Sequence, residues 1–221
     1  MNSSIKACVF DVYGTLFNVH SVKEKADELY PNKGAEISRL WRQKQLEYSF
    51  LRQLMGKYDT FWKITEDSLH YTLNSLKLEP SSEKINALMN SYLHLSPYPE
   101  VAEVLTQLKS KRLAVFSNGS HDMLDTLIQN SGLAHFFSEI ISVDDRKQYK
   151  PTPASYHYVL DVLGLERSDI LFMSSNGWDI SGARAFGFQT AWINRNQLPE
   201  EELGVKPHRI HTDLHGILTE I

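Results

Sequence analysis

The hydrophobic residues divide the chain into three kinds of segment. A short apolar run over residues 5–10 ends at Asp11 and a glycine-containing turn, which is typical of a buried parallel strand. Residues 18–97 follow helical periodicity instead, most clearly between Ile37 and Met55. After the proline-rich linker at 96–99, short apolar runs alternate with helical ones.

This alternation predicts the fold class. We expect strands at 113–116, 139–143, 170–173 and 189–193, and helices at 100–111, 121–131, 153–163 and 179–186. Thr152 is expected to cap the helix that Pro153 opens. Such an order implies a parallel sheet with right-handed crossovers. We therefore predict an α/β protein whose Rossmann-like core comprises residues 1–17 and 98–221. Residues 18–97 would form a helical cap inserted after the first strand, with further helices near 59–76 and, after a cap at Ser81-Ser82, near 83–95.

Composition narrows the function classes. The 221 residues carry a formal net charge of −4, which does not favour nucleic acid or an anionic membrane as a partner. We expect no signal peptide, and no apolar run approaches the ~18 residues of a membrane span. The single cysteine, Cys8, excludes a disulfide framework and fits a reducing cytoplasm. These features predict a soluble cytoplasmic protein.

Polar residues follow the predicted strands at one edge of the sheet. In open α/β sheets, ligands bind at the carboxyl ends of the strands. Those ends carry Asp11, the pair Ser117-Asn118, the loop to Lys150, and the segment 174–179. The inserted helices leave the core directly after Asp11, so they are placed to cover the site and exclude water.

Each of these residues has a structural and a functional interpretation. Asp11 is either an acid that caps a turn or a nucleophile, and Thr15 could hydrogen-bond its carboxylate. Lys150, held extended by the following proline, is either solvated or keeps Asp11 ionised. Asp179 is favourable at a helix N-terminus and could also orient Lys150 or a water.

The remaining candidates concern anion binding and the pocket wall. Ser117 and Asn118 precede a helix, so their side chains and the following amides suit an anion, although a simple helix cap fits equally. Trp178 fits a pocket wall better than the core. The C-terminal histidines at 208, 211 and 215 have loose metal-like spacing, but a solvated strand and helix is the better interpretation.

Together these motifs resemble the haloacid dehalogenase superfamily, and within it the type II L-2-haloacid dehalogenases. The resemblance rests on Asp11-Val12-Tyr13-Gly14-Thr15, on 40–48 in the cap, on Phe116 to Ser120, on Lys150-Pro151, and on Ser174 to Asp179. It implies a Rossmann-like core with an inserted helical cap and a cytoplasmic enzyme without cofactor. The implied reaction hydrolyses (S)-2-haloalkanoic acids to (R)-2-hydroxyalkanoic acids and halide through an ester on Asp11.

The resemblance also assigns roles to individual residues. Arg42 would reach from the cap to the halide with Asn118, and Ser117 would bind the substrate carboxylate. Lys150 would lie beside Asp11. The residues implied to orient Asp11 or the hydrolytic water are Thr15, Ser174, Asn176 and Asp179, with Tyr156 supporting Asp179 or Lys150. The apolar pocket would be formed by Tyr13, Leu46, Phe61 and Trp178.

Departures from the phosphatase branch agree with this chemistry. Tyr13 stands where a phosphatase would carry the acid that protonates its leaving group, whereas a halide needs no proton. Asp11 and Asp179 alone would give Mg²⁺ too few carboxylate ligands, so no metal is expected. A Mg²⁺-dependent phosphatase of the same fold and a non-catalytic anion-binding relative remain the alternatives. Relatives commonly form homodimers through cap helices, and the apolar positions of 36–55 permit this.

Overall fold

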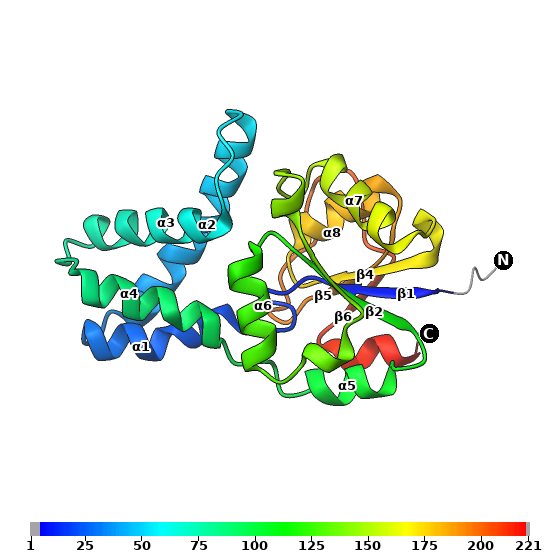
Figure 1. Cartoon of the computed structure of the whole chain (residues 1–221), viewed down its shortest axis with the longest axis horizontal. Coiled ribbons are helices and arrows are strands. Elements are labelled where there is room, and N and C mark those ends of the chain that lie inside the picture. The colour runs from blue at the N-terminus through cyan, green and yellow to red at the C-terminus, as the bar shows by residue number, and fades with distance from the viewer. Residues whose placement is uncertain (1–4, 220–221) are drawn as a thin grey trace.

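The computed structural model describes residues 5–219 (Figure 1). Residues 1–4 and 220–221, which belong to the predicted core, lie outside the described residues. Residues 1–4 also begin the N-terminal segment in which no signal peptide is expected. Among residues 5–219, no helix combines the length and apolar character that a membrane crossing requires.

A six-stranded sheet forms the centre of the core. Its strands are β1 (Ala7–Phe10), β2 (Arg112–Ser117), β3 (Glu139–Ser142), β4 (Ile170–Ser174), β5 (Gln189–Ile193) and β6 (Arg209–His211). They pair in the order β3-β2-β1-β4-β5-β6, and every pair is parallel. The predicted parallel α/β fold is therefore confirmed. The chain order reverses beside β1, between β2 and β4, which is where such sheets bind ligands.

Helices cover both faces of the sheet (Figure 1). One face carries α5 (Val101–Gln107), α6 (His121–Asn130) and the C-terminal 3₁₀ helix η6 (Leu214–Thr219), and the other carries α7 (Pro153–Leu163) and α8 (Gly177–Phe186). Because both faces are covered, β1 and β4 are buried along their whole length. This explains why their sequences are continuous apolar runs without alternation.

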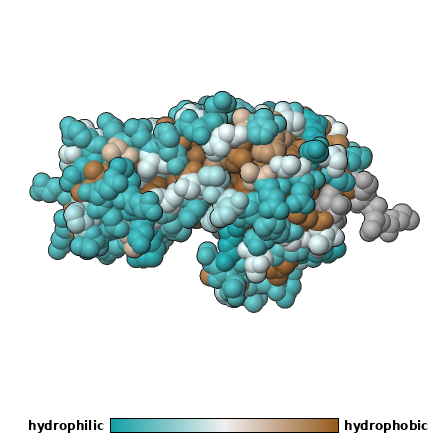
Figure 2. Space-filling model, turned by 90° about the horizontal axis from the view of Figure 1, so that it is seen from below, coloured by the Kyte–Doolittle hydropathy of each residue, from teal (hydrophilic) through white to brown (hydrophobic). Residues whose placement is uncertain are grey.

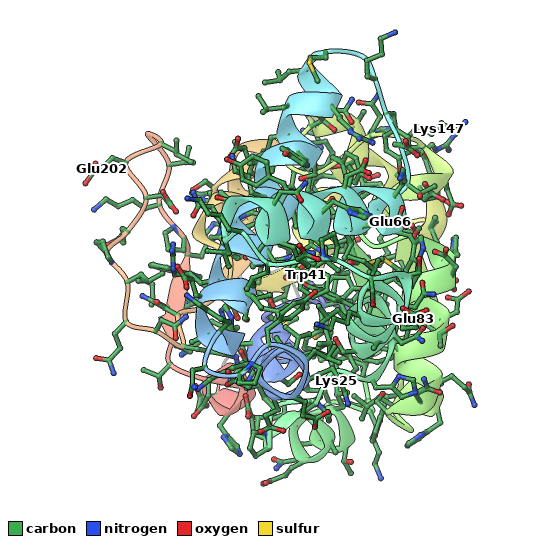
Figure 3. All side chains as sticks on the ribbon, turned by 90° about the vertical axis from the view of Figure 1, so that its left-hand side faces the viewer. Lys25, Trp41, Glu66, Glu83, Lys147 and Glu202 are labelled. Atoms are coloured by element: carbon green, nitrogen blue, oxygen red, sulfur yellow. The ribbon has the colours of Figure 1, made fainter. Side chains whose placement is uncertain are left out.

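Four further helices stand beside the carboxyl edge of the sheet, at the left of Figure 1. They are α1 (Val22–Leu29), α2 (Gly34–Leu54), α3 (Phe61–Ser75) and α4 (Ser82–Ser91). Trp41 lies at their centre (Figure 3), where its indole Nε1 donates to the carbonyl of Thr65 at 2.8 Å. Ser81 caps α4 as predicted, by accepting from the amide of Lys84.

The chain crosses between these helices and the core through two adjacent segments. Phe17 and Pro97 form an antiparallel bridge, and the amide of Tyr98 donates to the carbonyl of Leu16 at 2.9 Å. A second connection between these helices and the core joins the loop after α2 to the segment after β3: the hydroxyl of Tyr58 donates to the carboxylate of Asp144 at 2.6 Å. The face in Figure 2 is mostly hydrophilic, with hydrophobic side chains gathered near its middle.

Two local expectations differ from the structure. The expected C-terminal helix is a 3₁₀ helix that follows β6. Thr152 stands at the N-cap of α7 but does not cap it, because its hydroxyl donates to the carbonyl of Tyr149 at 2.8 Å. Pro153 suits the first position of α7, because an amide hydrogen there would have no partner within the helix.

Candidate active site

The carboxylate of Asp11 lies at the carboxyl ends of the strands and accepts four hydrogen bonds. It follows β1 directly and is only 4% exposed. Oδ2 accepts from Thr15 Oγ1 at 2.8 Å, Asn176 Nδ2 at 3.0 Å and Ser174 Oγ at 3.3 Å, whereas Oδ1 accepts only from Lys150 Nζ at 2.9 Å. Four donors from three loops hold the carboxylate in one orientation, which a nucleophile requires.

The ammonium of Lys150 joins two carboxylates. Its Nζ donates to Asp11 Oδ1 at 2.9 Å, to Asp179 Oδ2 at 2.7 Å and to the carbonyl of Phe116 at 3.2 Å. These three acceptors use all three of its hydrogens. Burial alone would lower the pKa of Lys150, but the charges of Asp11 and Asp179 outweigh it and raise that pKa. Lys150 is therefore a permanent cation at neutral pH.

Asp179 is the second carboxylate of this cluster and is fully buried. Burial raises its pKa to about 6, against the lowering effect of Lys150. The hydroxyl of Tyr156 donates to Asp179 Oδ1 at 2.8 Å and to the Asp179 carbonyl at 3.0 Å. Tyr156 is itself fully buried and lies behind Asp179, so it contacts the carboxylate from the side opposite Lys150.

The turn after Asp11 adopts its shape through Gly14. Gly14 has φ +93°, which residues with a Cβ rarely adopt. The turn brings Thr15 back to Asp11, and the Thr15 hydroxyl also accepts from the amide of Ser175 at 2.7 Å. Thr15 thus ties the β1 loop to the β4 loop, and both loops orient the same carboxylate.

Asn118 presents a hydrogen-bond donor to the cavity. Its Oδ1 accepts from the amide of Lys150 at 2.9 Å, which settles the orientation of the side-chain amide because a backbone N–H can only donate. Nδ2 is buried and has no hydrogen-bond partner within residues 5–219. Beside it, Ser117 Oγ accepts from the amide of Gly119 at 3.0 Å. The loop after β2 therefore offers donors to an anion.

Arg42 reaches the site from α2. Its guanidinium donates to Gln45 Oε1 at 2.7 Å and to the carbonyl of Tyr13 at 3.3 Å. Gln45 in turn donates to Thr65 Oγ1 at 2.7 Å. The guanidinium is thus held above the β1 loop, next to the cavity, and adds a second positive charge.

Ten of the fourteen predicted residues surround one cavity of about 10 Å³. They are Asp11, Tyr13, Arg42, Leu46, Phe61, Ser117, Asn118, Lys150, Asn176 and Trp178. The other four, Thr15, Ser174, Asp179 and Tyr156, are buried behind this wall. The Tyr13 ring packs on Phe61 with centroids 5.8 Å apart, and burial raises the pKa of its hydroxyl, so it stays neutral.

The donor set offers little to a metal ion. Within residues 5–219, no group of three or more His, Cys, Asp or Glu side chains is arranged to hold one. The two carboxylates closest to the cavity, Asp11 and Asp179, are already bridged by Lys150.

Two positioning residues, Gln45 and Arg195, were not among the candidates predicted from the sequence. Gln45 holds Arg42, and its i, i+3 spacing on the same helix would have indicated the pair. Arg195 follows β5 and donates to the carbonyl of Thr15 at 2.8 Å, while it pairs with Glu100 at 2.6 Å. Its place at a strand end was a usable signal, but its partners lie far away in the sequence.

Comparisons with known proteins agree with this geometry. The family model of the haloacid dehalogenase-like hydrolases matches residues 5–187. The chain is 46% identical to (S)-2-haloacid dehalogenase 2 of Pseudomonas sp. (strain CBS-3), over 95% of this chain and 93% of that protein. It is 47% identical to haloacetate dehalogenase H-2 of Moraxella sp. (strain B), over 92% of each.

A solved structure is similar over nearly the whole length. The L-2-haloacid dehalogenase from Xanthobacter autotrophicus with chloropropionic acid covalently bound has a TM-score of 0.91 and 39% identity, with 97% of each chain covered. The matches include the four helices as well as the sheet, since they span almost all of the chain. The chain therefore belongs to the haloacid dehalogenase-like hydrolases and, within them, to the (S)-2-haloacid dehalogenases.

Proposed function

We propose that the protein hydrolyses short (S)-2-haloalkanoic acids to (R)-2-hydroxyalkanoic acids and halide. The observation that carries this proposal is the setting of Asp11. Its carboxylate is held by four donors at the edge of an apolar cavity, and Lys150 lies at 2.9 Å from Oδ1. Tyr13 occupies the place of a second acid, so the site suits a leaving group that departs without a proton.

In the first step, Asp11 Oδ1 attacks C2 of the substrate. Oδ1 accepts one hydrogen bond and Oδ2 accepts three, so Oδ1 keeps a lone pair free for the attack. The new C2–O bond forms as the C2–halogen bond breaks, and the halide leaves with the bonding pair. We propose that Arg42 and Asn118 Nδ2 stabilise the departing anion, because both face the cavity. Ser117 would hold the substrate carboxylate.

In the second step, water attacks the ester carbonyl of Asp11 and restores the carboxylate. Its proton needs an acceptor with a pKa near neutrality, and Asp179 has a pKa raised to about 6. The charge of Asp11 contributes to that raised pKa, so ester formation lowers it and keeps Asp179 ionised as a base. Only the first step touches C2, so the configuration inverts.

A halide-release assay tests this function. We expect release from (S)-2-chloropropanoate in the presence of EDTA, no release from the (R)-enantiomer, and none from an Asp11→Asn variant. Turnover that requires Mg²⁺, or that prefers the (R)-enantiomer, would overturn the mechanism. Phosphate release from an aryl phosphate would instead support the phosphatase alternative.

We also propose that residues 18–97 act as a separate cap on a core formed by 1–17 and 98–221. The adjacent crossings at Phe17 and Pro97 support this division. Limited proteolysis tests it: cleavage at both crossings should release a folded fragment.

We propose a cytoplasmic location. The lone cysteine, Cys8, is buried in β1, and burial raises the pKa of its thiol to about 12, so it is not available for a disulfide.

We propose a homodimer that forms through the exposed side of α2 and α3. Leu51, Met55 and Tyr71 are 43%, 62% and 41% exposed, and Lys44 lies 4.4 Å from the Tyr71 ring. Burying such side chains against a second copy removes apolar surface from water. Sedimentation should give twice the chain mass, and a Leu51→Asp variant should sediment as a monomer. A monomeric parent protein would reject the proposal.

A further inference from the structure

A second cavity, open to solvent at Leu54, which is 83% exposed, lies directly beside the catalytic one. Its volume is about 320 Å³, whereas the catalytic cavity measures about 10 Å³, which is room for one water molecule. It is lined by Phe50, Gln53 and Leu54 of α2, by Tyr149, Lys150, Pro151 and Thr152 before α7, and by Trp178 of α8. Lys150 and Trp178 belong to the walls of both cavities, so these two side chains separate them.

Except for Trp178 Nε1, which is buried, the polar side-chain groups that line the second cavity are already paired. Gln53 donates to Gln148 at 3.2 Å and accepts from the amide of Tyr149 at 2.8 Å. Thr152 donates to the carbonyl of Tyr149. The ammonium of Lys150 has three acceptors elsewhere and its side chain is 1% exposed, so it offers no donor to the second cavity. The walls therefore suit a hydrocarbon and do not suit a halide ion, which needs donors.

Of the two residues between the cavities, Lys150 is fixed by its three hydrogen bonds, whereas Trp178 is held by packing. The rings of Phe50 and Trp178 meet edge to face, with centroids 5.0 Å apart and planes at 79°. Trp178 Nε1 has no hydrogen-bond partner within residues 5–219. No polar contact therefore opposes a rotation of the indole, which would join the two cavities.

We propose that the second cavity is a subsite for the alkyl tail of 2-haloalkanoic acids longer than propanoate. The proposal rests on the proposed function, which places C2 at Asp11 and the carboxylate at the loop after β2. With room for one water molecule, the catalytic cavity must widen to admit any haloacid, and rotation of Trp178 would widen it toward the second cavity. The space next to it lies past Trp178 and is apolar, and each methylene buried there contributes about fourfold in affinity.

The test fills the cavity from its wall. Phe50→Trp enlarges a ring that already lines the cavity, whereas the control Leu198→Trp adds an indole to a 56% exposed residue after β5, outside the lining. We compare kcat/KM for (S)-2-bromopropanoate and (S)-2-bromooctanoate. Phe50→Trp should lower kcat/KM for the octanoate by roughly 15- to 60-fold, the value for two or three methylenes, and leave the propanoate within twofold. Leu198→Trp should change neither.

Three outcomes overturn the proposal. An equal change for both substrates would mean that the cavity is an access path for every substrate. No change for either would mean that the tail lies elsewhere. A wild-type enzyme that rejects the octanoate would show that no tail subsite exists. Should Phe50→Trp lower the melting temperature strongly, Leu54→Trp at the same cavity replaces it.

A binding measurement separates this proposal from the proposed function. Calorimetry with unhalogenated propanoate and octanoate needs no turnover. If the protein releases no halide from any haloacid, the function fails. The subsite then still predicts tighter binding of octanoate than of propanoate, by a ratio that Phe50→Trp abolishes. Equal binding of both acids by the wild type would reject the subsite alone.

Discussion

Replacing Lys150 by Met tests the balance of charge at the site. The variant keeps an unbranched side chain but removes the ammonium at 2.9 Å from Asp11 and 2.7 Å from Asp179. All three side chains are at most 6% exposed, so the carboxylates lose a partner that water cannot replace. Removing one member of a buried pair costs about 3–5 kcal/mol. For a chain of this size, that lowers Tm by roughly 6–20 °C.

The loss of stability in the Lys150→Met variant should increase with pH. Asp179 already has a pKa raised to about 6, and without Lys150, which lowers it, that pKa rises further. A carboxyl whose pKa is higher in the folded state holds its proton there, so stability falls as pH rises from the unfolded pKa through the folded one. In the wild type, Lys150 stays charged between pH 5 and 8, because its pKa is raised. The Tm deficit of the variant should therefore be larger at pH 8 than at pH 5.

Thermal unfolding followed by circular dichroism at pH 5, 6.5 and 8 measures this effect. Lys147→Met is the matched control, because Lys147 is an exposed lysine three residues away (Figure 3). The reasoning is refuted if the Lys150→Met variant loses no more stability than the control. A deficit that stays constant from pH 5 to 8 would also refute it, since the raised pKa of Asp179 would then play no part.

Three further substitutions test the groups around Asp11. Thr15→Val removes the donor at 2.8 Å from Asp11 Oδ2 and should lower kcat about 10- to 100-fold in the halide-release assay, because the carboxylate loses its orientation. Tyr156→Phe removes a bond that lowers the pKa of Asp179, so the acidic limb of the kcat–pH profile should move to higher pH; an unmoved limb would argue against Asp179 as the base. Gly182→Ala places a Cβ 2.6 Å from the Tyr156 hydroxyl and should cost about 1–3 kcal/mol in urea unfolding, whereas an unchanged midpoint would show that Tyr156 can shift freely.

The sequence predicted much of the site because of the sheet's regularity. Parallel strands that are buried on both faces appear as apolar runs, and their carboxyl ends meet at one edge. Asp11, Asn118, Lys150 and Asn176 each follow such a run or its loop, and all four line the same cavity. Arg42 was placed there through the resemblance alone, because helical periodicity does not say which end of α2 meets the core.

Other features depended on contacts between distant residues. Arg195 pairs with Glu100 and the Thr15 carbonyl across separations of 95 and 180 residues, which no local pattern encodes. The failure of Thr152 to cap α7 has a local origin instead, because its hydroxyl donates to the carbonyl of Tyr149, three residues earlier.

Periodicity and residue type are local properties, and they were enough to predict the order of the strands and helices and the nucleophile candidate. The interpretation of Tyr13 as a missing second acid came from the family resemblance. Tertiary packing was needed to show that Lys150 bridges two carboxylates, that Asn118 Nδ2 faces the cavity, and that a larger apolar cavity lies beyond Trp178. These features arise where separate loops and helix α2 meet, so burial, pKa and cavity volume exist only once the chain has packed.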